Sequence, residues 1–214
     1  MPILARFLRL FFYLLYHPFA WSYDLVAWTV SLGRWKDWIS TVIPFIEGRQ
    51  VLELGHGPGH LQRHLLDLEL FAVGLDESRQ MGYLARQRTP QNGSPRARLV
   101  RGLGEHLPFP RDSFDTILAT FPTNYIFEGQ TLLEVRRTLK NGGRFVVLPV
   151  ALITGKRTVE RLAAWVFRIT GQAPSDPIES VGDELKKPFL EAGFQVEIHQ
   201  VEVKSSLVLI LVAV

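Results

Sequence analysis

The stretch Val51-Leu-Glu-Leu-Gly-His-Gly-Pro-Gly-His-Leu61 decides the fold, because an apolar run passes directly into a loop with three alternating glycines. Those glycines let the backbone turn sharply and approach a ligand without side chains in the way. A phosphate-cradling loop would need Gly-x-x-x-x-Gly-Lys-Ser/Thr, and no lysine follows here. A dinucleotide loop would need Gly-x-Gly-x-x-Gly, and the third glycine falls one position early. The spacing therefore argues against both common nucleotide loops.

Two acids end neighbouring apolar runs in this part of the chain. Glu53 lies two residues before the first glycine, where a carboxylate would repel a phosphate and attract a cationic ligand. Asp76 ends the run Phe71–Asp76, 21 positions after Gly55, which is the distance at which such an acid accepts ribose hydroxyls. Together the two acids describe a nucleoside with a positively charged tail and no phosphate. S-adenosylmethionine fits that description.

On these residues the sequence resembles the class I S-adenosylmethionine-dependent methyltransferases, and within them the small-molecule group typified by quinone-biosynthesis enzymes. The resemblance covers roughly residues 47–150. The segments that match the family's motifs are Glu53–Gly59, Gly74–Asp76 with Ser78 and Met81, Gly102–Phe109, Asp112–Asp115, and Asn141–Gly143 with the strand that follows.

The resemblance implies S-adenosylmethionine as cofactor and S-adenosylhomocysteine as product. In place of the acid that usually bonds the adenine amine, this chain has Leu103, so backbone groups around Gly104 and Glu105 are expected to hold the adenine. Met81 is expected to pack on the adenine ring. The cofactor-binding residues that the resemblance predicts are Glu53, Gly55, Gly57, Gly59, Asp76, Glu77, Met81, Gly104, Glu105 and Thr120.

The composition predicts one globular domain over residues 1–214, with 47% apolar and 21% charged residues. The net charge of +3 is too small and too dispersed to indicate a nucleic-acid partner. The absence of cysteine excludes disulfides, thiolate chemistry and cysteine-ligated zinc. His56, His60 and His64 recur every four positions, but they lack the His-Glu-x-x-His arrangement, so no metal site is predicted.

The alternation of apolar strands and helical segments predicts an α/β fold of three Rossmann-like layers, with a mostly parallel seven-stranded sheet and an antiparallel C-terminal strand. The expected helices are 3–16, 20–31, 34–46, 59–67, 78–87, 129–139, 155–170 and 182–192. The expected strands are 50–54, 71–75, 97–101, 115–119, 143–149, 194–203 and 206–214, with a turn at Asn141–Gly143.

The N-terminal region, residues 1–46, is expected to form a helical lid over the cofactor cleft. Residues 10–23 contain no Asp, Glu, Lys or Arg, yet they are too few to span a bilayer and Pro18 interrupts them. No signal-peptide cleavage site follows, so the sequence predicts a cytoplasmic protein. A compatible second reading is an interfacial segment that rests on a membrane near a lipid-soluble substrate. Residues 151–181 are expected to form an inserted helical region that walls the acceptor pocket.

The acceptor is expected beside the segment after the fourth strand, residues 119–126, where Asn124 and Tyr125 can hydrogen-bond it. Wall packing is the alternative role for Tyr125. His106 is the best-placed histidine for a general base, although a contact with adenine is an alternative role. These three residues are the candidate catalytic groups.

The sequence therefore predicts methyl transfer from S-adenosylmethionine to a small or lipid-like acceptor, without nucleic acid as a partner. Two alternatives remain open at this stage. One is a non-catalytic protein that binds S-adenosylmethionine, and the other is an aminopropyl-transferase-like enzyme on the same fold. The second usually needs acids that hold a polyamine, and residues 119–127 contain none.

Overall fold

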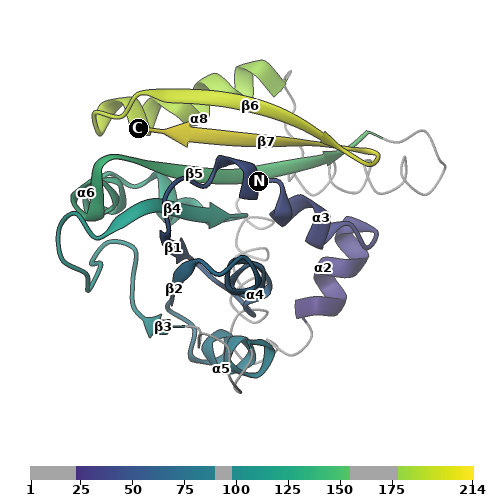
Figure 1. Ribbon diagram of the computed structural model, residues 1–214. Coiled ribbons are helices and arrows are strands. Elements are labelled where there is room, and N and C mark those ends of the chain that lie inside the picture. Colours follow the sequence, from purple (N-terminus) through teal and green to yellow (C-terminus); the bar gives the residue numbers. More distant parts are fainter. Residues whose placement is uncertain (1–22, 90–97, 155–177) are drawn as a thin grey trace, which may run out of the picture.

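The computed structural model describes residues 23–89, 98–154 and 178–214 (Figure 1). In this part of the chain one seven-stranded sheet lies between two groups of helices. The elements, in chain order, are α2 (Tyr23–Ser31), α3 (Trp35–Ser40), η2 (Ile43–Phe45), β1 (Gln50–Leu54), α4 (His60–Asp67), β2 (Phe71–Asp76), α5 (Arg79–Arg88), β3 (Arg98–Arg101), β4 (Phe114–Thr120), η3 (Asn124–Phe127), α6 (Gly129–Thr138), β5 (Leu139–Ile153), α8 (Ile178–Glu191), β6 (Val196–Val203) and β7 (Ser206–Ala213).

The strand order in the sheet is β3-β2-β1-β4-β5-β7-β6. Strands β1 to β5 pair in parallel, while β7 runs antiparallel to both β5 and β6. The predicted fold class is therefore confirmed. The chain leaves β1 toward β2 and β3 and later returns on the other side of β1 as β4, so the strand order reverses between β1 and β4. In open α/β sheets, ligands bind beyond the carboxyl ends of the strands at such a point.

Two apolar clusters hold helices on the two faces of the sheet. Successive strand residues point to opposite faces, so Val51 belongs to one cluster while Leu52 and Leu54 belong to the other. The Val51 face packs against α3 and α4, through residues such as Trp38 and Leu65. The opposite face packs against α6 and α8, whose buried members include Leu132, Val135 and Phe189.

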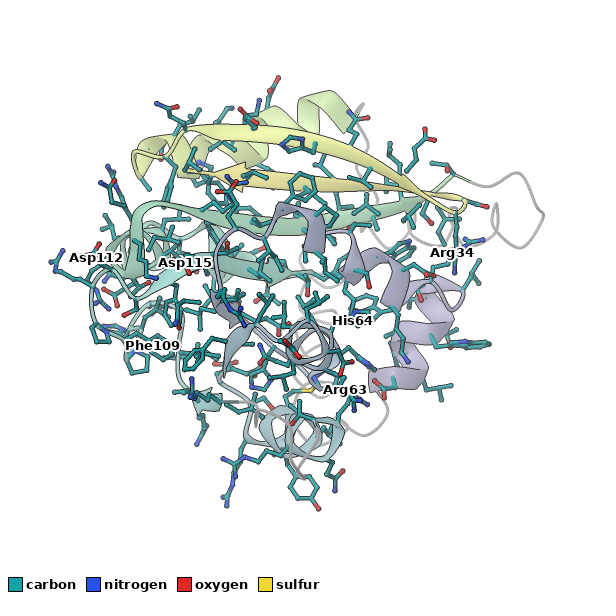
Figure 2. The ribbon with its side chains drawn as sticks, viewed as in Figure 1. Arg34, Arg63, His64, Phe109, Asp112 and Asp115 are labelled. Atoms are coloured by element: carbon teal, nitrogen blue, oxygen red, sulfur yellow. The ribbon has the colours of Figure 1, made fainter. Side chains whose placement is uncertain are left out.

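The amino-terminal edge of the sheet is held by a carboxylate at the start of β4. Asp115 accepts hydrogen bonds from the backbone N–H groups of Arg49 and Gln50, at 2.9 and 2.8 Å, and an ion pair from Lys140 at 2.6 Å. Figure 2 shows Asp115 at the end of the sheet that lies away from α2 and α3. These bonds fix the start of β1, and through it the position of the glycine loop at the other end of that strand.

The predicted helix over residues 34–46 is wrong as one element. The structure has a short α3 and then the 3-10 turn η2, because Pro44 has no N–H to donate to the carbonyl one turn earlier. The predicted helix 182–192 also begins earlier, since α8 starts at Ile178.

The predicted turn at Asn141–Gly143 and strand 143–149 also need correction. The structure has one long strand, β5, over Leu139–Ile153. Leu139 pairs with Phe114 and Arg144 pairs with Thr116, with a register shift between these pairs. The glycines therefore form a bulge rather than a reversal, because the residues on both sides of them pair with the same neighbour, β4.

Several predictions fall outside the described residues. These are the helices 3–16 and 155–170, most of the inserted region 151–181 and the first part of the lid over residues 1–46. Within the three described ranges, every helix is too short or too polar to cross a membrane.

Candidate functional site

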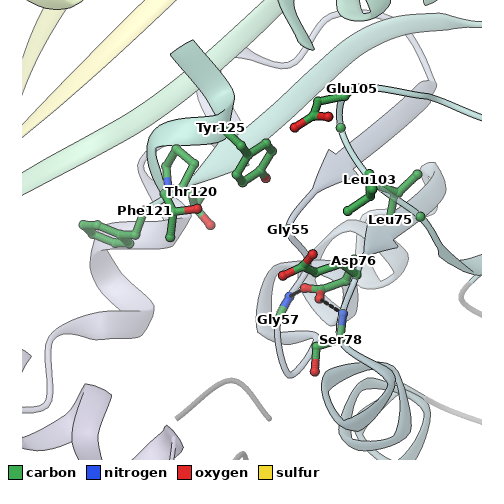
Figure 3. A pocket seen from close by; sticks show the side chains of 15 residues that line it. Gly55, Gly57, Leu75, Asp76, Ser78, Leu103, Glu105, Thr120, Phe121 and Tyr125 are labelled. Atoms are coloured by element: carbon green, nitrogen blue, oxygen red, sulfur yellow. Dashed lines mark hydrogen bonds between the residues drawn. The ribbon is translucent and has the colours of Figure 1, made fainter. Parts of the chain in front are cut away.

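A cleft of about 240 Å³ opens beyond the carboxyl ends of the parallel strands, at the point where their order reverses. Figure 3 shows Gly55 at its centre, with Asp76, Leu75 and Leu103 on one side and Thr120, Phe121 and Tyr125 on the other. The residues that line the cleft are Gly55, Gly57, Leu75, Asp76, Glu77, Ser78, Gly102, Leu103, Gly104, Glu105, Thr120, Phe121, Pro122, Thr123 and Tyr125.

The carboxylate of Asp76 is fixed by backbone groups at the tip of β2. Its Oδ2 accepts the N–H of Gly57 at 2.8 Å, and its Oδ1 accepts the N–H of Ser78 at 2.8 Å (Figure 3). The first bond ties the glycine loop to the neighbouring strand, and the second caps the turn into α5. Each carboxylate oxygen has a further lone pair, so the half-buried group can still accept two hydroxyls from the cleft.

Glu53 lies beneath the glycine loop rather than in the main cleft. Its side chain is only 2% exposed, and its Oε2 accepts the side-chain amide of Gln62 at 2.8 Å. Burial raises the pKa of Glu53 to about 8; the Gln62 hydrogen bond opposes this shift and the charge of Asp76 adds to it. A buried acid of this kind favours a cation beside it, because a positive charge would stabilise the ionised form.

A second, smaller pocket of about 30 Å³ lies over Glu53, between the glycine loop and α3. Trp35 and Ile39 of α3 line it, together with Pro58 and His60. Three residues, Gly55, Gly57 and Thr120, line both pockets, so the two pockets are neighbours at the glycine loop. A ligand that contacts Asp76 in the main cleft would therefore lie close to the pocket over Glu53.

Tyr125 overhangs the glycine loop from η3. A Cβ atom added to Gly55 would lie 2.9 Å from the Tyr125 hydroxyl, and one added to Gly104 would lie 2.9 Å from its ring. Both glycines thus leave space that the Tyr125 side chain occupies, with its hydroxyl over Gly55.

A network of polar side chains ties α2 and α5 to the glycine loop. Arg88, at the end of α5, donates to the carbonyl of Pro58 and pairs with Asp24 of α2 at 2.5 Å. The same Asp24 contacts His60 Nε2, at the start of α4, at 2.8 Å. Burial lowers the pKa of His60. Arg88 therefore fixes the backbone of the loop that shapes both pockets.

Replacement of Arg88 by methionine tests this network. Arg88→Met keeps the aliphatic stem but leaves the Pro58 carbonyl without its charged donor. We expect the affinity for S-adenosylhomocysteine, measured by titration calorimetry, to fall by about tenfold. The matched control is Arg63→Met on α4, which removes an exposed pair with Asp67 and should leave the affinity unchanged. If the two variants bound S-adenosylhomocysteine with equal affinity, Arg88 would not be the residue that fixes the glycine loop for cofactor binding.

The structure leaves five predicted site residues outside the main cleft, of which Glu53 lines the smaller pocket and the other four line neither pocket. Gly59 begins α4 and packs against Ala85, and Met81 is buried within the fold at 1% exposure. His106 is exposed, and its charge acts on Glu134 of α6. Asn124 is exposed at the start of η3. The side chains of His106 and Asn124 therefore do not line the space where an acceptor would enter.

The three histidines at four-residue spacing have separate partners. His56 Nδ1 donates to the carbonyl of Gly57 at 2.7 Å, His60 pairs with Asp24, and His64 contacts Ser40 Oγ at 3.2 Å. These partners lie on different elements, so each ring has a local structural contact.

Sequence reasoning missed the aromatic part of the site. Trp35 and Phe121 lie 86 positions apart, yet their rings stack with centroids 4.4 Å apart. Arg88 and Asp24 were missed for the same reason, since they are 64 positions apart. Only the position of Phe121 directly after the fourth strand could have indicated a role in the site.

The donor set of the two pockets fits a sulfonium nucleoside. Asp76 offers acceptors for ribose hydroxyls, the buried Glu53 favours a positive charge, and the cleft of about 240 Å³ leaves room for a ligand. An anionic phosphate would meet two acids at the same positions. The chemistry of the residues therefore agrees with S-adenosylmethionine.

Comparisons with known proteins agree with this geometry. Residues 52–147 match the family model described as "Methyltransferase domain". The demethylmenaquinone methyltransferase of Thermotoga maritima is 30% identical over 175 residues, which cover 76% of this chain and 73% of that protein. The ubiquinone/menaquinone biosynthesis C-methyltransferase of Bartonella quintana is 31% identical over 164 residues, which cover 72% of this chain and 63% of that protein. This chain thus spans less than two thirds of the Bartonella protein's length.

A solved structure also shares the fold. The S-adenosylmethionine-dependent methyltransferase from Aquifex aeolicus superimposes with a TM-score of 0.60 at 19% identity, covering 84% of this chain and 91% of that one.

Proposed function

Because this chain belongs to the class I S-adenosylmethionine-dependent methyltransferases, with S-adenosylmethionine as its cofactor, we propose that it methylates a small, lipid-like acceptor. A quinol that lacks one ring methyl group is the first candidate, since the relatives from Thermotoga and Bartonella are named for menaquinone and ubiquinone biosynthesis. The observation that carries the proposal is a pair of carboxylates on adjacent strands: Asp76 lines the main cleft, and Glu53 lines the smaller pocket beside it.

The cofactor supplies a methyl group that is activated by the positive charge on sulfur. In the proposal, Asp76 accepts the ribose hydroxyls and the backbone around Leu103, Gly104 and Glu105 holds the adenine. Glu53 then lies under the charged tail, where its ionised form stabilises the cation. These residues orient the methyl group, and orientation alone can supply much of the rate enhancement of an in-line displacement.

Tyr125 is the group that we propose to meet the acceptor. Its hydroxyl lies over Gly55, a residue that lines both pockets. There it can hydrogen-bond a hydroxyl oxygen of the quinol and so hold the unsubstituted ring carbon in line with the methyl group. The carbon–methyl bond forms as the sulfur–methyl bond breaks, and the ring carbon then loses its proton to solvent. His106 and Asn124, the other two candidates, would need to move from exposed positions to take part.

The direct test is a methyl-transfer assay with the full chain, labelled S-adenosylmethionine and a panel of reduced naphthoquinols and benzoquinols that lack a ring methyl group. We expect label in at least one quinol, detected by mass spectrometry. Cofactor binding without transfer to any acceptor would favour the non-catalytic alternative. Transfer of an aminopropyl group from decarboxylated S-adenosylmethionine to a polyamine would favour the aminopropyl-transferase alternative.

Removal of the Asp76 carboxylate should weaken cofactor binding. In Asp76→Ala the ribose loses its charge-assisted acceptor, and the Gly57 and Ser78 amides lose theirs. We expect a loss of about 1–3 kcal/mol in the binding free energy of S-adenosylmethionine, measured by titration calorimetry. Unchanged affinity for S-adenosylmethionine would show that Asp76 does not contact the cofactor. Asp67→Ala, which removes an exposed carboxylate from α4, is the matched control.

We further propose that the N-terminal segment rests on a membrane surface, which would bring the cleft close to a lipid-soluble acceptor. Residues 10–23 lack charged side chains, and the α2 helix that follows exposes Leu25 and Trp28 by 65% and 63%. Full-length protein should then co-sediment with vesicles that contain anionic lipid, and deletion of residues 1–16 should abolish this. Full-length protein that stays in the supernatant would contradict the proposal.

A further inference from the structure

The charged and uncharged residues of the main cleft lie on opposite sides. The acids among its lining residues are Asp76, Glu77 and Glu105, which belong to the segments that follow β2 and β3. The segment after β4 contributes Thr120, Phe121, Pro122, Thr123 and Tyr125, so every lining residue that the structure describes on that side is uncharged. A ligand on that side would meet apolar and hydroxyl groups.

Phe121 has an unusual backbone in this segment. Its φ angle is +48°, in the left-handed region of backbone conformation that residues other than glycine and asparagine rarely adopt. Its N–H donates to the carbonyl of Leu148 at 2.7 Å, which fixes the residue at the end of the sheet. A glycine would adopt this conformation at less cost, but it would lose the ring contacts that Phe121 makes with Trp35 and Trp38. Backbone strain of this kind is often found where a site holds a ligand.

The Phe121 ring packs against α3 at the border of the main cleft. It stacks on Trp35 with centroids 4.4 Å apart and planes at 29°, and Trp38 packs against it with centroids 6.0 Å apart. Phe121 lines the main cleft, while Trp35 lines the smaller pocket over Glu53. The stacked pair therefore borders both pockets, next to Thr120, which lines both.

We propose that Phe121, supported by Trp35, is the specificity-determining residue of the acceptor site and selects a planar, uncharged ring. This inference rests on the proposed methyl transfer and narrows its acceptor class. A flat ring can stack on an aromatic side chain, whereas a polyamine or another cation would meet no carboxylate among the described residues that line this side of the cleft. The matching role of Tyr125 is to hydrogen-bond an oxygen substituent of the same ring.

The test measures binding of 1,4-naphthoquinone by titration calorimetry to the full chain saturated with S-adenosylhomocysteine. Phe121→Gly and Phe121→Asn both tolerate the left-handed backbone but lack the phenyl ring. We expect each to bind naphthoquinone about tenfold more weakly than the wild type, with the affinity for S-adenosylhomocysteine changed less than about twofold. Trp35→Leu removes the ring that stacks on Phe121, so it should also weaken naphthoquinone binding, but by less.

Two results would overturn the inference. One is a wild-type protein that does not bind naphthoquinone, and the other is a Phe121→Gly variant that binds it as tightly as the wild type. If Phe121 only packs α3 onto the sheet, the three variants lower the thermal stability and leave naphthoquinone affinity unaltered. The proposed function has a separate test. If the protein binds naphthoquinone but methylates no quinol, the role of Phe121 in ring binding would stand and the proposed methyl transfer would be wrong.

Discussion

Glu53→Gln should stabilise the cofactor-free protein at alkaline pH and weaken its binding of S-adenosylmethionine. Both effects follow from one buried carboxyl with a pKa of about 8, against an ordinary value of 4.5. The glutamine has nearly the same shape, and its carbonyl oxygen can still accept the hydrogen bond from Gln62. The substitution therefore removes the charge and little else.

The effect on stability depends on pH in a defined direction. Between about pH 4.5 and 8 the folded protein keeps the Glu53 proton that the unfolded chain has lost, so the free energy of unfolding falls as pH rises through this range. We expect Glu53→Gln and the wild type to be similar near pH 5. Above about pH 8 the variant should be more stable, by on the order of 3 kcal/mol in urea denaturation.

The effect on cofactor binding has the opposite sign. The positive charge of S-adenosylmethionine should lower the pKa of Glu53, so that binding releases a proton and wild-type affinity rises with pH up to about 8. In Glu53→Gln we expect affinity about ten- to a hundredfold weaker at alkaline pH and nearly independent of pH. Titration calorimetry in buffers of different ionisation enthalpy measures the released protons directly.

Glu69→Gln is the matched control for this experiment, since Glu69 is exposed in the turn before β2. It should change neither the stability nor the affinity. A Glu53→Gln variant that binds the cofactor as tightly as the wild type above pH 8 would show that this carboxylate does not face the positive charge.

Gly59→Ala should cause a large loss of stability. Gly59 has a φ of +84°, and an added Cβ would lie 2.8 Å from the Cβ and 2.9 Å from the Cα of Ala85 on α5. The left-handed backbone costs about 1–2 kcal/mol for a residue with a Cβ, and the clash with backbone that cannot move away adds about 1–3 kcal/mol. We therefore expect a loss of roughly 2–5 kcal/mol, measured by urea denaturation followed by circular dichroism.

A control at Gly57 separates the cost of the left-handed backbone from the cost of the clash with Ala85. Gly57 also has a positive φ, of +51°, but an added Cβ would meet nothing within 4 Å. Gly57→Ala should therefore lose only the backbone contribution, about 1–2 kcal/mol. If both variants lost the same stability, the close packing of α4 on α5 at Gly59 would not be the cause.

The fold could be predicted from the sequence because its signals are local. The apolar runs that become β1, β2 and β4 are short and bounded, and the glycine loop after β1 fixes where a helix must follow. The acids Glu53 and Asp76 were found in the same way, since parallel neighbours place their carboxyl ends at one edge of the sheet. The bulge in β5 was missed because a pair of glycines looks the same in a bulge and in a turn.

The rest of the site depends on contacts between distant parts of the chain. The sequence could not place Glu53 below the loop and Asp76 beside it, because that depends on which face of each strand the helices cover. The stack of Phe121 on Trp35 depends on where α3 crosses the sheet, and the bond from Arg88 to the Pro58 carbonyl depends on how α5 ends. His106 was favoured for its position in a motif, yet its side chain is exposed.

We expect S-adenosylmethionine to occupy the cleft between the tips of β1 and β2. A crystal structure of the full chain with S-adenosylmethionine bound would show its position. Both ribose hydroxyls should lie within hydrogen-bonding distance of Asp76, the adenine against the backbone of Leu103 to Glu105, and the amino-acid end above Glu53. A nucleoside bound elsewhere, or an Asp76 carboxylate turned away from the ribose, would contradict this placement.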